Sequence, residues 1–130
     1  MDTSGFVALV QGQQDALLCS ASLQARGFPQ YVTLTVVAET HRRLLFDHGR
    51  DVALRFLADL YSGDTAVVRP EEQDERSAVG LIGKYADLRL TLCDALTCAI
   101  MFRLGIMRAF TYDHNHFHPI GFITVPPLDL

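Results

Sequence analysis

The chain has 130 residues, of which 49% are hydrophobic and 20% charged, a composition that predicts one folded domain and excludes a disordered chain. The net charge of −4 by itself neither supports nor excludes a polyanionic substrate. No apolar run is long enough to cross a bilayer, and the acidic start argues against a secretory signal. Three cysteines without C-x-x-C spacing favour reduced thiols in a cytoplasmic protein over a disulfide framework or a structural zinc site.

Hydrophobic periodicity and stop signals divide the chain into alternating helices and short strands. Helices are expected over residues 6–10, 16–25, 36–46, 52–61, 70–86 and 90–104, and strands over residues 31–35, 65–69, 106–112 and 122–125. Gly49, Gly63 and Gly105 each follow the last apolar position of a helix, where glycine commonly ends one. Helices that alternate with short apolar strands predict an α/β fold with a parallel sheet covered on both faces.

Four acidic residues fall near strand ends and helix starts, where α/β sheets collect their sites. Asp2 opens the chain, Glu39 lies in the first turns of the helix after the 31–35 strand, Asp94 is near the start of the most apolar helix, and Asp113 ends the 106–112 strand. Four such carboxylates in one crevice would need a cation, and oxygen ligands suit Mg²⁺ or Mn²⁺ rather than zinc. The alternative, that each acid is a helix cap or a surface charge, stays open.

Four segments contain these acids: Asp2-Thr3-Ser4, residues 35–40 (TVVAET), residues 85–95 (YADLRLTLCDA) and residues 109–113 (AFTYD) with Phe117 after it. In this order and at these separations they resemble PIN-domain ribonucleases, most closely the VapC-type toxins of bacterial toxin–antitoxin pairs. The resemblance covers essentially the whole chain. It implies a single PIN-like domain over residues 1–130, a three-layer α/β sandwich with a short, mostly parallel central sheet flanked by helices.

The resemblance also implies a function and a set of site residues. The function is that of a Mg²⁺-dependent endoribonuclease, a hydrolase in which a metal-activated water attacks an RNA phosphodiester; such toxins are usually homodimers inhibited by a cognate antitoxin. The implied catalytic and metal-binding quartet is Asp2, Glu39, Asp94 and Asp113, with Asp87, Thr3, Ser4 and Thr111 as accessory residues. Weaker candidates for RNA contacts are Arg42, Arg43, Arg103 and His114.

Two features of the sequence lead to other interpretations. Family members normally carry a few apolar residues before the D-T-S motif, whereas here Asp2 directly follows Met1, so the first strand is expected to be missing or truncated. The alternative function is therefore a degenerate or truncated PIN domain that binds without cleaving. A third, weaker hypothesis is a transition-metal clamp of His114 and His116, although no nearby residue supplies the further ligand and outer partners that zinc usually takes.

A helical apolar stripe marks a possible partner surface. Its members are Phe46, Phe56, Leu57, Leu60 and Tyr61. Most of the stripe is expected in the core, and part of it on a surface for a partner.

Overall fold

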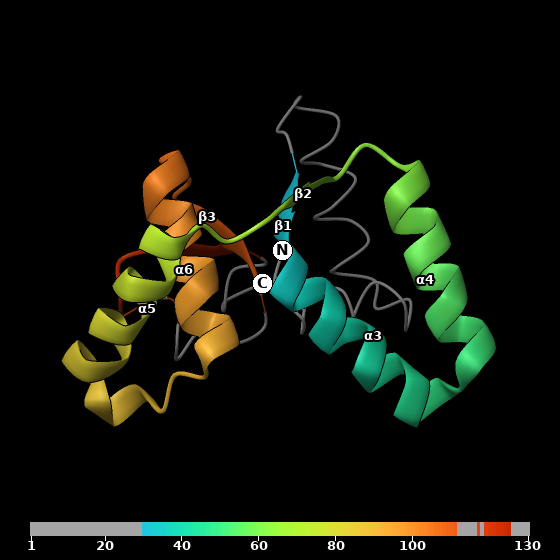
Figure 1. Ribbon diagram of the computed structural model, residues 1–130, viewed down its shortest axis with the longest axis horizontal. Helices are drawn as coiled ribbons and strands as arrows, with labels where there is room; N and C mark the ends of the chain where they lie inside the picture. The colour runs from blue at the N-terminus through green and yellow to red at the C-terminus, as the bar shows by residue number, and fades with distance from the viewer. Residues whose placement is uncertain (1–29, 112–116, 118, 126–130) are drawn as a thin grey trace.

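The computed structural model describes residues 30–111, 117 and 119–125 (Figure 1). The predicted helices over 6–10 and 16–25 and the expected loss of the first strand lie outside these residues. Among the helices of the described ranges, none is long and apolar enough to cross a membrane.

The described elements follow the predicted order. They are β1 Tyr31–Thr33, α3 Leu34–His48, α4 Arg50–Ser62, β2 Ala66–Val68, α5 Glu72–Lys84, the 3-10 turn η1 Ala86–Leu88, α6 Leu92–Leu104, β3 Arg108–Phe110 and β4 Ile123–Val125. Helix α3 begins at Leu34, earlier than predicted, because Thr33 caps it: the Thr33 Oγ1 accepts a hydrogen bond from the Val36 N–H at 3.3 Å. Helix α5 ends at Lys84, short of the predicted residue 86, and η1 begins at Ala86. After η1, Arg89 takes a left-handed conformation with φ 53°.

The described strands form two parallel pairs. Strand β1 pairs with β2 in the register Val32 to Val67, and β3 pairs with β4 in the register Ala109 to Thr124. Figure 1 shows α3 and α4 on one side of these strands and α5 and α6 on the other. The architecture is therefore mixed α/β with parallel strands flanked by helices, as the alternation of elements predicted.

Two main apolar clusters form the core of the described residues. The first joins β1, α3 and α4 and consists of Val32, Val36, Val37, Leu44, Ala53, Phe56 and Leu60. The second joins α6 and β3 to the C-terminal segment and consists of Leu90, Cys98, Met101, Ala109, Phe117, Ile120 and Phe122. Cys93, in the first turn of α6, packs against the first cluster. The start of α6 is therefore held against the α3–α4 half of the molecule.

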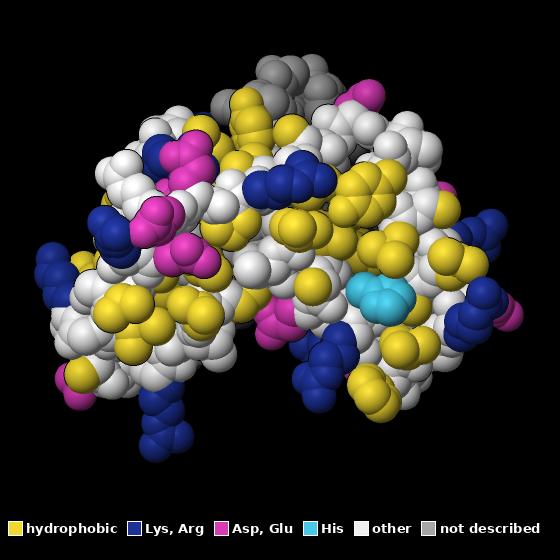
Figure 2. Space-filling view, in the orientation of Figure 1, with side chains coloured by type: hydrophobic (Ala, Val, Ile, Leu, Met, Phe, Trp, Pro, Cys, Tyr) yellow, Lys and Arg dark blue, Asp and Glu magenta, His cyan; other side chains and the backbone are white. Residues whose placement is uncertain are grey.

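The apolar stripe on α3 and α4 is divided between core and surface. Phe56 and Leu60 are buried, whereas Phe46 is 76% exposed and Tyr61 is 56% exposed. Figure 2 shows hydrophobic side chains on the surface over this half of the molecule. Leu57 is partly buried against the first cluster, so the stripe divides between core and surface more evenly than predicted, and the partner surface stays a prediction.

Candidate metal centre

The structure describes two of the four predicted metal ligands, Glu39 and Asp94. The predicted site residues outside the described part are Asp2, Thr3, Ser4, Asp113 and His114. Within the described ranges, no three His, Cys, Asp or Glu side chains gather as a metal site would require. The complete quartet therefore stays a prediction.

Asp94 is positioned by the start of α6. It is the third residue of the helix and is only 8% exposed. Its Oδ2 accepts a hydrogen bond from the Thr91 N–H at 3.3 Å, and its own N–H donates to Thr91 Oγ1 at 3.1 Å. These reciprocal bonds are a capping box, which satisfies two backbone donors that a helix start would otherwise leave unpaired. The sequence pattern T-x-x-D contains this signal, but Thr91 is not among the predicted site residues.

Glu39 lies on the helix that contacts the start of α6. It is in the second turn of α3 with its side chain exposed. Helices α3 and α6 contact each other, and Cys93, the neighbour of Asp94, packs against the cluster that contains Val36 and Val37 of α3. The fold thus brings together the two helices that carry these carboxylates. Their oxygen donors fit Mg²⁺ or Mn²⁺ in chemical type.

Thr40, the residue after Glu39, has a fully buried side chain. Its Oγ1 finds no hydrogen-bond partner among the residues that the structure describes. An unsatisfied buried hydroxyl costs about 1–3 kcal/mol. The sequence shows a threonine at a helical core position, and only the packing shows that its hydroxyl meets no partner within the described residues.

The two accessory residues in the described part occupy connections. Thr111 directly follows β3 and is fully buried. Asp87 lies in η1, the connection that leads to α6, with its side chain exposed. Their accessory roles remain predictions.

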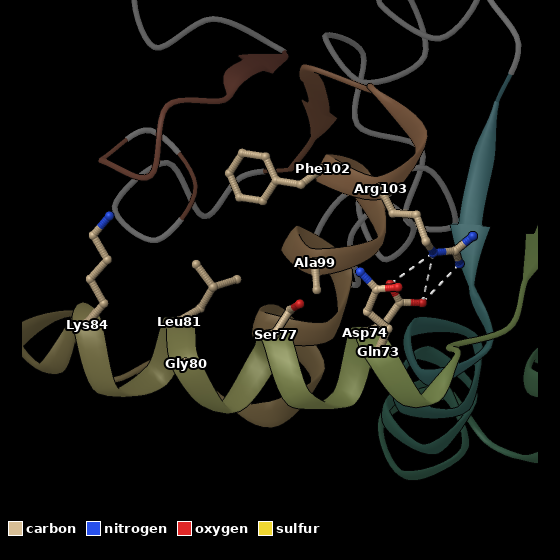
Figure 3. Close-up of a pocket in the computed structure, with 9 residues that line it drawn as sticks. All are labelled: Gln73, Asp74, Ser77, Gly80, Leu81, Lys84, Ala99, Phe102 and Arg103. Atoms are coloured by element: carbon tan, nitrogen blue, oxygen red, sulfur yellow. Dashed lines mark hydrogen bonds and ion pairs between the residues drawn. The ribbon is translucent and has the colours of Figure 1, made fainter.

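The three arginines predicted to contact RNA differ in their surroundings. Arg42 and Arg43 are exposed on α3, where the Arg42 guanidinium lies 5.6 Å from the centre of the Phe46 ring and Arg43 lies 3.7 Å from Asp47. Arg103 instead joins α6 to the start of α5 through Asp74 (Figure 3). Arg42 and Arg43 are therefore exposed, while Arg103 is engaged within the fold, and the RNA-contact role of all three stays a prediction.

The bond between Arg103 and Asp74 is a bidentate ion pair. Arg103 Nε donates to Asp74 Oδ1 at 2.9 Å and to Oδ2 at 3.1 Å, and Nη2 donates to Oδ2 at 2.9 Å. The Asp74 side chain is 2% exposed, and Glu71 also lies 3.4 Å from Arg103 Nη1. The hydrogen bond from Arg103 is the main reason that the pKa of Asp74 lies below its ordinary value; burial opposes that shift.

A hollow of about 470 Å³ lies between α5 and α6. Its lining residues are Gln73, Asp74, Ser77, Gly80, Leu81, Lys84, Ala99, Phe102 and Arg103 (Figure 3). Neither Glu39 nor Asp94, the two candidate ligands in the described part of the chain, is among these lining residues.

No family model matches the chain, and neither does any curated protein. Among solved structures, the chain is similar to Mycobacterium tuberculosis VapC20, a sarcin–ricin-loop-cleaving toxin, with a TM-score of 0.82 over 97% of each chain and 24% sequence identity. The chain therefore has the fold of a VapC-type PIN domain, and the resemblance found in the sequence motifs is confirmed at the level of fold.

Proposed function

We propose that this protein is a Mg²⁺- or Mn²⁺-dependent endoribonuclease, the toxin of a toxin–antitoxin pair. The observation that carries the proposal is the likeness in fold to VapC20, which extends over 97% of both chains. The contact between α3 and α6, the helices that carry Glu39 and Asp94, supports it further. Fold alone does not define activity, so the proposal depends on the acidic residues.

In this proposal Asp2 and Asp94 would hold the first ion, and Glu39 and Asp113 would supply further oxygen ligands or hold a water. A divalent ion there would supply a water of lowered pKa and neutralise charge on the scissile phosphodiester. The hydroxyls of Thr3, Ser4 and Thr111 orient the carboxylates or the attacking water, and Asp87 is accessory.

The substrate and partners follow from the same likeness. RNA is the proposed substrate, with Arg42 and Arg43 contacting phosphates from the exposed side of α3 and His114 at the rim. A cognate antitoxin inhibits the enzyme in the cytoplasm, and the active form is a homodimer. The RNA that VapC20 cleaves, the sarcin–ricin loop, is one candidate target among several.

The test is an RNA cleavage assay on the full chain with Mg²⁺ or Mn²⁺ and a panel of RNAs that includes the sarcin–ricin loop. Asp94→Asn should lower the cleavage rate by about 100-fold or more, since losing even an outer partner of a metal ligand typically costs 10–100-fold. Its circular dichroism spectrum should stay that of the wild type. Asp59→Asn, at an exposed position of α4, is the matched control and should cleave normally.

Two results would contradict this function. Cleavage that persists in Asp94→Asn, or in excess EDTA, would show that these carboxylates and their metal are not the catalytic site. A folded wild-type protein that binds RNA with either metal present but cleaves none of the panel would favour the non-catalytic binding module instead.

A further inference from the structure

We propose that Thr91 is a positioning residue for metal binding: its hydroxyl fixes the first turn of α6 so that the Asp94 carboxylate is held ready for the ion. This inference rests on the proposed function. It adds a residue that touches neither metal nor RNA and acts through Asp94.

The bonds of Thr91 constrain Asp94 at both ends. Thr91 Oγ1 accepts from the Asp94 N–H at 3.1 Å, which fixes the backbone, and the Thr91 N–H donates to Asp94 Oδ2 at 3.3 Å, which fixes the side chain. A carboxylate attached at one oxygen to a backbone donor cannot rotate freely, so its direction is set before any ligand arrives. Preorganisation of this kind lowers the entropy cost of binding.

The residues on both sides of Thr91 are fixed by the surrounding structure, so the position of Thr91 is set when it bonds Asp94. Leu90 is buried in the second cluster, and Arg89 before it is held in a left-handed turn, so the chain enters α6 by a fixed path. On the other side of the turn, Cys93 packs against the α3–α4 cluster, and its carbonyl accepts from Thr97 Oγ1 at 2.9 Å. Apolar packing therefore fixes Leu90 and Cys93, while the Thr91 hydroxyl fixes the backbone of Asp94.

Helix α3 offers a matched control within the same chain. Thr33 caps it with the same residue type, accepting from the Val36 N–H at 3.3 Å. The third residue of α3 is a valine, and Glu39 lies one turn further along, beyond the reach of the cap. Loss of the Thr33 hydroxyl should therefore weaken a helix start without misplacing a ligand.

The experiment measures the affinity of the full chain for Mn²⁺ alone, by calorimetry and by the electron paramagnetic resonance of free Mn²⁺. Thr91→Val should weaken binding by about tenfold, the lower part of the range for outer partners of metal ligands. Thr91→Ser, which keeps the hydroxyl, should bind Mn²⁺ within about twofold of the wild-type affinity. Thr33→Val should also stay within about twofold of the wild-type affinity, although its loss of thermal stability should be comparable to that of Thr91→Val. Thr91→Gly keeps a good capping residue without the hydroxyl and should behave like Thr91→Val even if the valine variant folds poorly.

The outcomes separate this inference from the proposed function. Wild-type affinity in both Thr91→Val and Thr91→Gly would overturn the role of Thr91 while leaving the metal site in place. An equal loss of affinity in Thr33→Val would show that Thr91 acts only through general stability. If wild type binds Mn²⁺ no better than Asp94→Asn, the proposed metal site itself is contradicted, and the role of Thr91 with it.

Discussion

Helices α5 and α6 both begin with a capping box whose third helical residue is an aspartate, and they differ in the groups that surround that aspartate. In each, the third helical residue is an aspartate whose Oδ2 accepts the N–H of the residue before the helix: Asp74 from Glu71 at 2.8 Å and Asp94 from Thr91 at 3.3 Å. Asp74 also accepts hydrogen bonds from the Arg103 guanidinium in a bidentate ion pair. Asp94 instead lies in the turn that packs against α3, which carries Glu39.

This difference shows that a capping box by itself defines no function. The helix start stabilises a carboxylate in both positions, because backbone N–H groups and the helix dipole favour the anion there. A guanidinium 29 residues along the chain makes Asp74 a structural link between two helices. Asp94, which the motif resemblance makes a candidate ligand, lies in the turn that packs against α3. The distant partner, rather than the local motif, separates the two roles.

The largest expected effect comes from exchanging the two aspartates for asparagine one at a time. Asp94→Asn should abolish most Mn²⁺ binding, while Asp74→Asn should leave the affinity within about twofold of the wild type. Thermal stability should follow the reverse order: Asp74→Asn loses a charged, bidentate pair and should lower Tm by about 5 °C or more, whereas Asp94→Asn should lower it less. Calorimetric titration and thermal melts of both variants check this. The comparison fails if both variants lose metal affinity equally.

A smaller effect concerns the dependence of stability on pH. The pKa of Asp74 in the folded protein is lowered below that of an unfolded aspartate, about 3.9. The stabilisation by its carboxylate is therefore fully present above about pH 4 and is lost as the pH falls through the lower folded-state pKa. Urea midpoints of wild type and Asp74→Asn should stay separated by a constant amount at neutral pH and converge below about pH 4. A separation that remains constant in acid would contradict the assigned ion pair.

The smallest expected effect extends the comparison to buried hydroxyls on the two helices that carry the candidate ligands. Thr40 of α3 has no partner for Oγ1 among the described residues, whereas Thr97 of α6 donates to the Cys93 carbonyl at 2.9 Å. Thr40→Val should stabilise the fold by up to about 1 kcal/mol, and Thr97→Val should destabilise it by about the same amount. Urea unfolding of the two variants compares the signs. Destabilisation by Thr40→Val would show that its hydroxyl has a partner in the native protein.

Much of the fold could be predicted because its signals are local. Glycines at 49, 63 and 105 end helices where they were expected to, and the β-branched segments became strands. The errors are at boundaries. Helix α3 starts at Leu34, inside the predicted strand, because the Thr33 hydroxyl accepts the Val36 N–H and caps the helix there. Helix α5 ends at Lys84 and is followed by a 3-10 turn. The acids of the candidate site were found by their places next to these elements, and the motifs pointed to the fold that the similarity to VapC20 confirms.

The sequence by itself therefore determined the order of the elements and the glycines that end three helices, because these signals depend on residues within a few positions of one another. The candidacy of Glu39 and Asp94 came from the order and separation of motifs along the whole chain. Only the tertiary structure decided that Arg103 is bound to Asp74, that Cys93 brings the start of α6 against α3, and that Phe46 stays exposed while Phe56 is buried. Those outcomes depend on groups far apart in the chain, whose charge and burial are defined only after the helices have packed.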